Sequence, residues 1–185
     1  MRLSLLLLFA CTSTLSNQEV ATHLPGEAKP NPNAPGSLGT GADAPDFALE
    51  DQNGRVRGLG ELRQAGPVLV FFYPGSLSED ARQQLARLQA KLRAFPPSAT
   101  IIAVSPDPKS VSAKLREELK LDYPLLSDSD LRAARAFKVA DAASGVALPT
   151  LFVIDREGKI RWRFRPGEGR YAEDEAIDAV RRAMM

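Results

Sequence analysis

Two serines and an aspartate cluster where the chain changes character, in the stretch FFYPGSLSEDARQQLARL at residues 71–88. Ser76 and Ser78 offer hydroxyl groups and Asp80 offers a carboxylate at the expected junction of a strand and a helix. A serine becomes a nucleophile only when a nearby base takes its proton. The single histidine, His23, lies far upstream in a Pro- and Gly-rich segment, so no such base is at hand. We therefore interpret these polar residues as helix-capping groups.

The composition excludes several other kinds of site. The 185 residues include one cysteine and one histidine, which are too few for an intramolecular disulfide or a Cys/His metal centre. The formal net charge is +1, with acidic and basic residues interspersed. A nucleic-acid partner would favour a strongly basic surface. We expect no metal, no cofactor and no nucleic-acid partner.

The N-terminus has the pattern of an export signal. Arg2 precedes a short leucine-rich run that ends in Ala10 and Cys11. The run is too short to span a bilayer, which takes about 20 residues. The letters LFAC resemble the lipobox of bacterial lipoproteins, and this resemblance implies cleavage before Cys11 and acylation of its thiol. The alternative is an ordinary signal that ends in cysteine.

The chain then divides into three parts. Residues 1–10 form the expected lipoprotein-type signal peptide. Residues 11–40 are rich in Pro, Gly and Asn and lack apolar periodicity, so we interpret them as a disordered tether. Residues 41–185 carry all the apolar patterning and form the expected folded domain.

Within that domain, apolar runs and helical stripes alternate. The Asn-Gly pair at positions 53 and 54 predicts a hairpin, and Ser76 with Glu79 predicts a capping box that opens a helix. Strands are predicted at residues 68–73, 100–105, 123–128, 151–154 and 159–164, and helices after residue 76 and at 109–119, 131–137 and 172–185. This order predicts an α/β fold with a mixed central β-sheet flanked by helices.

Six segments in this order resemble a known family. They are GADAPDFAL (41–49), DQNGRV (51–56), VLVFFYP (68–74), VSPD (104–107), YPLLSD (123–128) and FVIDREGKI (152–160). Together they resemble the alkyl hydroperoxide reductase/thiol-specific antioxidant family, which comprises the peroxiredoxins and their redoxin relatives. The resemblance implies a thioredoxin fold over nearly the whole domain.

The nucleophile of that family has no counterpart in this chain. Peroxiredoxins carry the motif P-x-x-x-T-x-x-C after the first core strand, and its thiolate attacks peroxide. Here Pro74 matches the proline, Ser78 keeps the hydroxyl of the threonine, and Ala81 stands at the cysteine position. The C-x-x-C register of thioredoxins places Leu77 and Asp80 at the two sulfur positions. Neither register contains sulfur.

A second departure lies before the last pair of strands. Leu148, Pro149 and Thr150 resemble the cis-proline segment of thioredoxin-like proteins, which faces the active-site helix and exposes backbone groups to an extended partner. This resemblance predicts a cis Leu148–Pro149 bond and a binding role for Pro149 and Thr150. Peroxiredoxins usually place a catalytic arginine in the slot of Pro149. A copper chaperone of this fold would need a cysteine pair and a histidine that the domain lacks.

Three functions follow from these features. The first is a lipid-anchored, redox-inactive module of the bacterial cell envelope that binds a protein or peptide through the former substrate groove. The second is an atypical antioxidant thiol oxidoreductase or peroxidase that acts through a partner's thiol. The third is a structural envelope protein without a ligand. The missing cysteine favours a protein that is not an enzyme, and the family favours an enzyme.

Overall fold

A computed structural model describes residues 38–141, 143–166 and 172–185. The predicted signal peptide, most of the tether, and Cys11 and His23 lie outside these residues. The described chain forms a seven-stranded mixed sheet with the strand order β2-β1-β5-β4-β3-β8-β9 and a separate two-stranded hairpin, β6-β7. The predicted α/β architecture with a mixed central sheet is confirmed.

The three central strands are parallel, largely buried and mostly apolar, as is typical of strands that are covered by helices on both faces. They are β3 (Val68–Phe72), β4 (Thr100–Ser105) and β5 (Leu125–Ser127). The remaining strands pair antiparallel and are β1 (Ala48–Asp51), β2 (Val56–Gly58), β6 (Ala140–Asp141), β7 (Val146–Ala147), β8 (Thr150–Ile154) and β9 (Ile160–Phe164).

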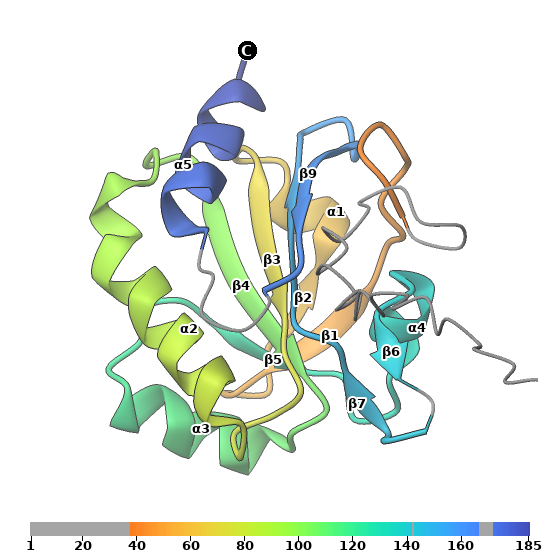
Figure 1. The fold of residues 1–185 in the computed structure, drawn as a ribbon, viewed down its shortest axis with the longest axis vertical. Coiled ribbons are helices and arrows are strands. Elements are labelled where there is room, and N and C mark those ends of the chain that lie inside the picture. Colours follow the sequence, from red (N-terminus) through yellow and green to blue (C-terminus); the bar gives the residue numbers. More distant parts are fainter. Residues whose placement is uncertain (1–37, 142, 167–171) are drawn as a thin grey trace, which may run out of the picture.

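Helices cover both faces of the sheet (Figure 1). One face packs against α2 (Glu79–Lys91), which continues into the 3-10 turn η1 (Leu92–Ala94), and against α3 (Lys109–Glu118) and α5 (Glu173–Arg182). The other face packs against α1 (Leu59–Leu62) and α4 (Arg132–Ala136). The core therefore has two apolar layers that share the sheet.

Most predicted elements are present with small shifts at their ends. The strand at 100–105 has the predicted bounds, and Asn53–Gly54 does join two antiparallel strands, with Gly54 at a φ of +78°. The sequence did not predict α1 or the hairpin β6-β7, because two to four residues are too few to show periodicity. The last helix is shorter than the predicted 172–185 and ends at Arg182.

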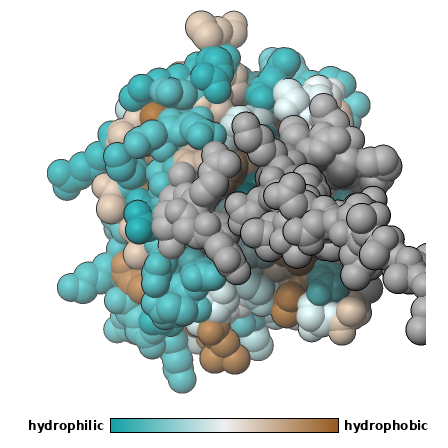
Figure 2. Space-filling view, in the orientation of Figure 1, coloured by the Kyte–Doolittle hydropathy of each residue, from teal (hydrophilic) through white to brown (hydrophobic). Residues whose placement is uncertain are grey.

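The surface of the described domain is largely hydrophilic. On the face drawn in Figure 2, hydrophobic residues form small, separate patches outside the grey atoms. Large apolar side chains that are strongly exposed are few among the described residues, and include Val56, Leu77, Met184 and Met185. No helix within the described ranges is long and apolar enough to cross a membrane.

Candidate functional site

The candidate site lies where β3 ends and α2 begins, at the lower end of the sheet in Figure 1. The backbone N–H of Tyr73 continues the pairing with β4 by donating to the carbonyl of Val104 at 2.9 Å. The carboxylate of Asp107, from the turn after β4, then accepts a 2.7 Å hydrogen bond from the backbone N–H of Ser76. The turn after the neighbouring parallel strand β4 thus holds the loop 74–78.

Gly75 is required at this point of the loop. Its φ is +135°, a backbone conformation that residues with a Cβ rarely adopt. A Cβ added there would lie 3.0 Å from Oδ1 of Asp107. The glycine therefore permits both the turn and the close approach of the carboxylate that holds the loop.

Ser78 caps helix α2, and this corrects one prediction. Its side chain accepts a 3.2 Å hydrogen bond from the backbone N–H of Ala81. The predicted capping box of Ser76 and Glu79 is wrong, because the helix begins at Glu79 and the N–H of Ser76 is already bound to Asp107. The hydroxyl that matches the family's threonine thus serves as the N-cap.

Ala81 occupies the third position of the helix and offers no reactive group. It is only 3% exposed, and its methyl group belongs to the apolar cluster between α2 and the sheet. The first turn also carries Glu79 and Asp80, acids that suit the positive end of the helix dipole. The arrangement stabilises the helix start and supplies no nucleophile.

A buried group of hydroxyls lies beneath the loop. Tyr73, Ser105 and Ser112 are fully buried. The hydroxyl of Ser105 donates to Asp107, whereas those of Tyr73 and Ser112 form no hydrogen bond of good geometry with the described residues. Burial raises the pKa of Tyr73, and the carboxylate of Asp107 raises it further, although the neighbouring hydroxyls of Ser105 and Ser112 act in the opposite direction. Tyr73 therefore stays protonated at neutral pH and cannot act as a base.

The segment 148–150 does lie beside the loop, as the resemblance implied. Thr150 pairs with Phe72, which places Pro149 and Leu148 next to the end of β3. Pro149 is half-buried. Thr150 is fully buried, and its hydroxyl donates to the carbonyl of Leu148 at 3.1 Å. A partner at this edge would therefore meet Pro149 and backbone atoms rather than the Thr150 hydroxyl.

The predicted cis bond between Leu148 and Pro149 is wrong, because no peptide bond of the described residues is cis. The trans bond is consistent with the local pairing. The backbone N–H of Leu148 donates to the carbonyl of Val139 at 2.6 Å, and Pro149 directly precedes β8, where a proline removes no ladder hydrogen bond.

Leu77 is the exposed feature of the loop. It is 100% exposed, although its neighbour Ser76 is fixed by Asp107 and Ser78 is fixed by the helix cap. Glu79 and Asp80 are exposed on its C-terminal side. An apolar side chain beside two acids is suited to a protein contact rather than to chemistry. Among the described residues, no group of His, Cys, Asp and Glu side chains could hold a metal ion.

The strand order and the loop at the end of β3 define a protein of the thioredoxin fold. The sequence model of the AhpC/TSA family matches residues 40–163. The chain therefore belongs to the AhpC/TSA family.

Individual relatives agree with this assignment. The chain is 33% identical to alkyl hydroperoxide reductase E of Mycobacterium tuberculosis over 138 residues, which cover 72% of this chain and 90% of the relative. It is 26% identical to the chloroplastic peroxiredoxin Q of Oryza sativa over 155 residues, or 83% of this chain and 71% of the relative. The crystal structure of peroxidoxin BcpB from Mycobacterium tuberculosis superimposes with a TM-score of 0.71 and 31% identity, over 77% of this chain and 96% of that one.

Sequence reasoning named the residues of the candidate site but did not predict the contact that holds its loop. It singled out Pro74, Ser78 and Ala81, which the structure places together in one loop and helix turn. It did not predict that Asp107 holds the loop, although the VSPD segment was part of the resemblance. The contact joins residues 31 positions apart, and its partner on the loop is a backbone N–H that no sequence pattern marks.

Proposed function

We propose that this chain is a redox-inactive member of the AhpC/TSA family that is lipid-anchored in the bacterial cell envelope and binds a protein or peptide. The observation that carries the proposal is the absence of sulfur at the site. The only cysteine of the chain is Cys11, and the segment 40–163 that matches the family has none. Peroxide reduction in this family requires a thiolate, and Ala81 stands at the start of α2 where that thiolate would be.

A second feature supports the loss of peroxide chemistry. Pro149 occupies the slot where peroxiredoxins usually carry an arginine, and a proline has no charge to stabilise the developing anion. The loop itself is nevertheless well fixed, by Asp107 at Ser76 and by the cap of Ser78. A loop that keeps its shape without its nucleophile is suited to binding.

The exposed side chain of Leu77 is the expected centre of that binding surface. Interfaces gain most of their affinity from a few apolar anchors that enter a pocket of the partner. Leu77 is fully exposed on a loop held at both sides, so little ordering entropy is lost when it binds. Glu79 and Asp80 beside it favour a partner with basic residues around an apolar pocket.

The experiment is a capture of envelope proteins by the acylated full chain, with two matched variants. Leu77→Asp changes the proposed anchor, and Val56→Asp changes another exposed apolar residue, which is 56% exposed on β2. We expect a partner that the wild type and Val56→Asp retain and that Leu77→Asp loses. Identical captured sets for all three chains would contradict the binding surface.

The anchor is tested by fractionation. The lipoprotein modification adds several acyl chains, which together hold a protein stably at a membrane. We expect the wild-type chain in the membrane fraction and Cys11→Ser in the soluble fraction. Wild type in the soluble fraction would contradict acylation of Cys11.

A further inference from the structure

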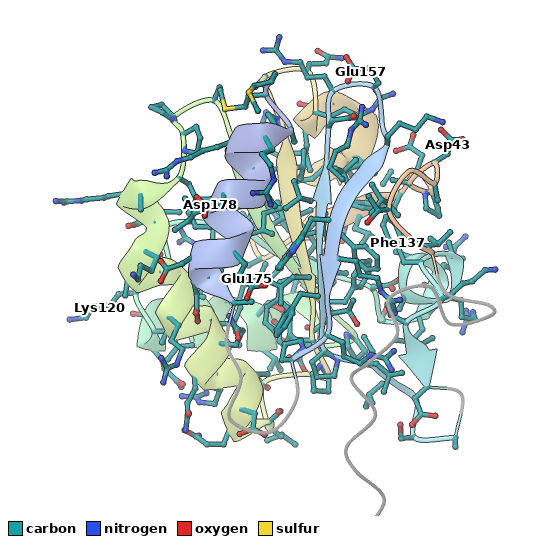
Figure 3. All side chains as sticks on the ribbon, turned by 45° about the horizontal axis from the view of Figure 1, so that its top comes forward. Asp43, Lys120, Phe137, Glu157, Glu175 and Asp178 are labelled. Carbon is teal, nitrogen blue, oxygen red and sulfur yellow. The ribbon has the colours of Figure 1, made fainter. Side chains whose placement is uncertain are left out.

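A cavity of about 790 Å³ opens at the other end of the sheet from the candidate site. Its walls come from the residues before β3, the turn between β8 and β9, and the end of α5. Figure 3 shows the labelled Glu157 at the same end of the molecule as the C-terminal end of α5. The residues that carry the argument are Gly66, Ser98, Asp155, Arg156, Arg161 and Arg182.

This cavity is separate from the candidate site. Gly66 and Pro67 precede β3, whereas Pro74 and Ser78 follow it. A strand of five residues spans about 17 Å, at roughly 3.3 Å per residue. A ligand in the cavity would therefore lie a full strand length from Ala81, and its binding does not depend on the function proposed above.

One guanidinium group of the cavity is fixed by a buried acid. Asp155 is 1% exposed, and its carboxylate accepts a 2.7 Å hydrogen bond from the backbone N–H of Lys159 and forms an ion pair with Nε of Arg161. The side chain of Arg161 remains half exposed. A guanidinium has five N–H donors, and this ion pair uses only the Nε–H.

The guanidinium groups of Arg156 and Arg182 are the other two cations of the cavity. Arg156 donates one N–H to the carbonyl of Ala65 at 2.8 Å, which orients its guanidinium and leaves its other donors available. Arg182, at the end of α5, forms no ion pair with the described residues. The acids of the cavity wall are Asp155, which is engaged by Arg161, and the exposed Glu157. The side chains of the cavity wall therefore carry three positive and two negative charges.

The cavity floor is built by a close backbone approach. A Cβ on Gly66 would lie 2.3 Å from the carbonyl oxygen of Ser98, so only glycine allows the two segments to pack this closely. Ser98 also contributes a hydroxyl-bearing side chain to the wall. The shape of the cavity thus depends on the absence of a side chain at position 66.

We infer that this cavity is a binding site for a phosphate group. Planar guanidinium groups match the oxygens of a phosphate, and each can donate two parallel N–H bonds. Arg156, Arg161 and Arg182 carry three positive charges against the carboxylates of Asp155 and Glu157. The remaining single positive charge, reduced by the negative end of the α5 dipole, suits a singly charged phosphate group. The phosphate group belongs to a soluble metabolite or to the head group of an anionic lipid.

The test titrates inorganic phosphate into the full chain carrying Cys11→Ser, and follows backbone amide resonances together with the heat of binding. We expect the amides of Gly66, Ser98 and Arg161 to shift. Arg182→Gln and Arg156→Gln should each weaken binding about tenfold, the usual effect of losing one charge-assisted hydrogen bond. Arg132→Gln, on α4 away from the cavity, is the matched control and should bind as the parent chain does.

A vesicle arm distinguishes the two sources of phosphate. Binding to phosphatidylglycerol vesicles that phosphate competes away and that Arg182→Gln reduces would identify a lipid head group. Phosphate binding without that vesicle binding would identify a soluble ligand, and either result supports the site. The inference is overturned if millimolar phosphate shifts none of these amides, or if Arg182→Gln and Arg156→Gln bind phosphate as tightly as Arg132→Gln does.

Discussion

The two ends of strand β3 differ in how they use their polar groups. At the end that leads into α2, the loop's principal polar groups bind one another: Asp107 binds the N–H of Ser76, and Ser78 binds the N–H of Ala81. At the other end, each of the Arg156 and Arg161 guanidinium groups uses one donor in a contact with the described residues. The loop before α2 thus binds its backbone N–H groups within the protein, whereas the opposite end carries guanidinium groups with exposed donors.

This difference suggests that the fold of the loop and the chemistry of the family depend on different residues. The loop before α2 is kept by hydrogen bonds that stabilise the helix start, and these do not need a cysteine. These contacts would hold the loop in the same shape with or without a cysteine at position 81.

The largest expected effect is at the cavity end. Gly66→Ala places a methyl group 2.3 Å from the carbonyl oxygen of Ser98, and such overpacking costs about 3 kcal/mol in the free energy of unfolding. Gly58→Ala is the matched control, because its Cβ would lie at an ordinary 3.7 Å from the nearest atom, the carbonyl oxygen of Phe47. Urea denaturation measures the free energy of unfolding of both variants. Equal stabilities of the two variants would show that the segments at Gly66 and Ser98 are not tightly packed.

At the candidate site, Asp107→Ala should lower the free energy of unfolding by somewhat less than Gly66→Ala does. It leaves the N–H of Ser76 without its acceptor and removes the partner of the Ser105 hydroxyl. The expected loss is about 2 kcal/mol, in the range for unsatisfied partners of a charged group. Hydrogen exchange should show the amide of Ser76 losing protection while amides of β8 keep theirs. Unchanged protection at Ser76 would contradict the role of Asp107 in holding the loop.

A smaller effect on the free energy of unfolding is expected from the helix cap, and it should differ between Ser76 and Ser78. Ser78→Ala removes the acceptor for the N–H of Ala81 and should cost about 1 kcal/mol. Ser76→Ala should be close to neutral, since only its backbone N–H is engaged. Denaturation curves of the two variants decide the register of the cap. A larger loss for Ser76→Ala would restore the capping box that the sequence predicted.

The free energy of unfolding should also depend on pH through Asp128. Asp128 lies after β5, at the same end as the candidate site, and burial raises its pKa above the ordinary 3.8 even though the N–H groups of Ala134 and Ala133 bind it. The folded state therefore holds the proton more tightly than the unfolded state, and stability falls as pH rises from 3.8 through the raised pKa. Asp128→Asn should remove this part of the slope between acidic and neutral pH. An identical slope in the variant would contradict the assignment.

The fold was predictable because its signals are strong and local. The apolar runs at β3, β4 and β8 and the Asn-Gly turn each identify their element without reference to the rest of the chain. The fixed spacing of the family motif aligns Ala81 with the cysteine position, and this alignment stays a prediction. The cap register was not predictable, because both Ser76 and Ser78 fit a capping pattern and only the contact of Asp107 decides between them.

The cavity was not predictable for a different reason. Its guanidinium groups come from the turn after β8, from β9 and from the end of α5, and its floor comes from Gly66 and Ser98. No short motif links these positions, so they meet only after the sheet is assembled. The trans bond before Pro149 was not predicted, because the resemblance to thioredoxin-like proteins favoured a cis bond, whereas most X-Pro bonds in folded proteins are trans.

The central claim is that the loop at the start of α2 no longer reduces peroxide, and peroxide consumption by the purified full chain tests it most directly. The assay uses hydrogen peroxide and an alkyl hydroperoxide with a thiol reductant, and compares the wild-type chain with Cys11→Ser, so that any reaction of Cys11 is identified. We predict that Cys11→Ser consumes no more peroxide than the reductant alone, because Ala81 supplies no thiol and Pro149 supplies no charge. Catalytic turnover by Cys11→Ser, with Ala81 unchanged, would contradict the account.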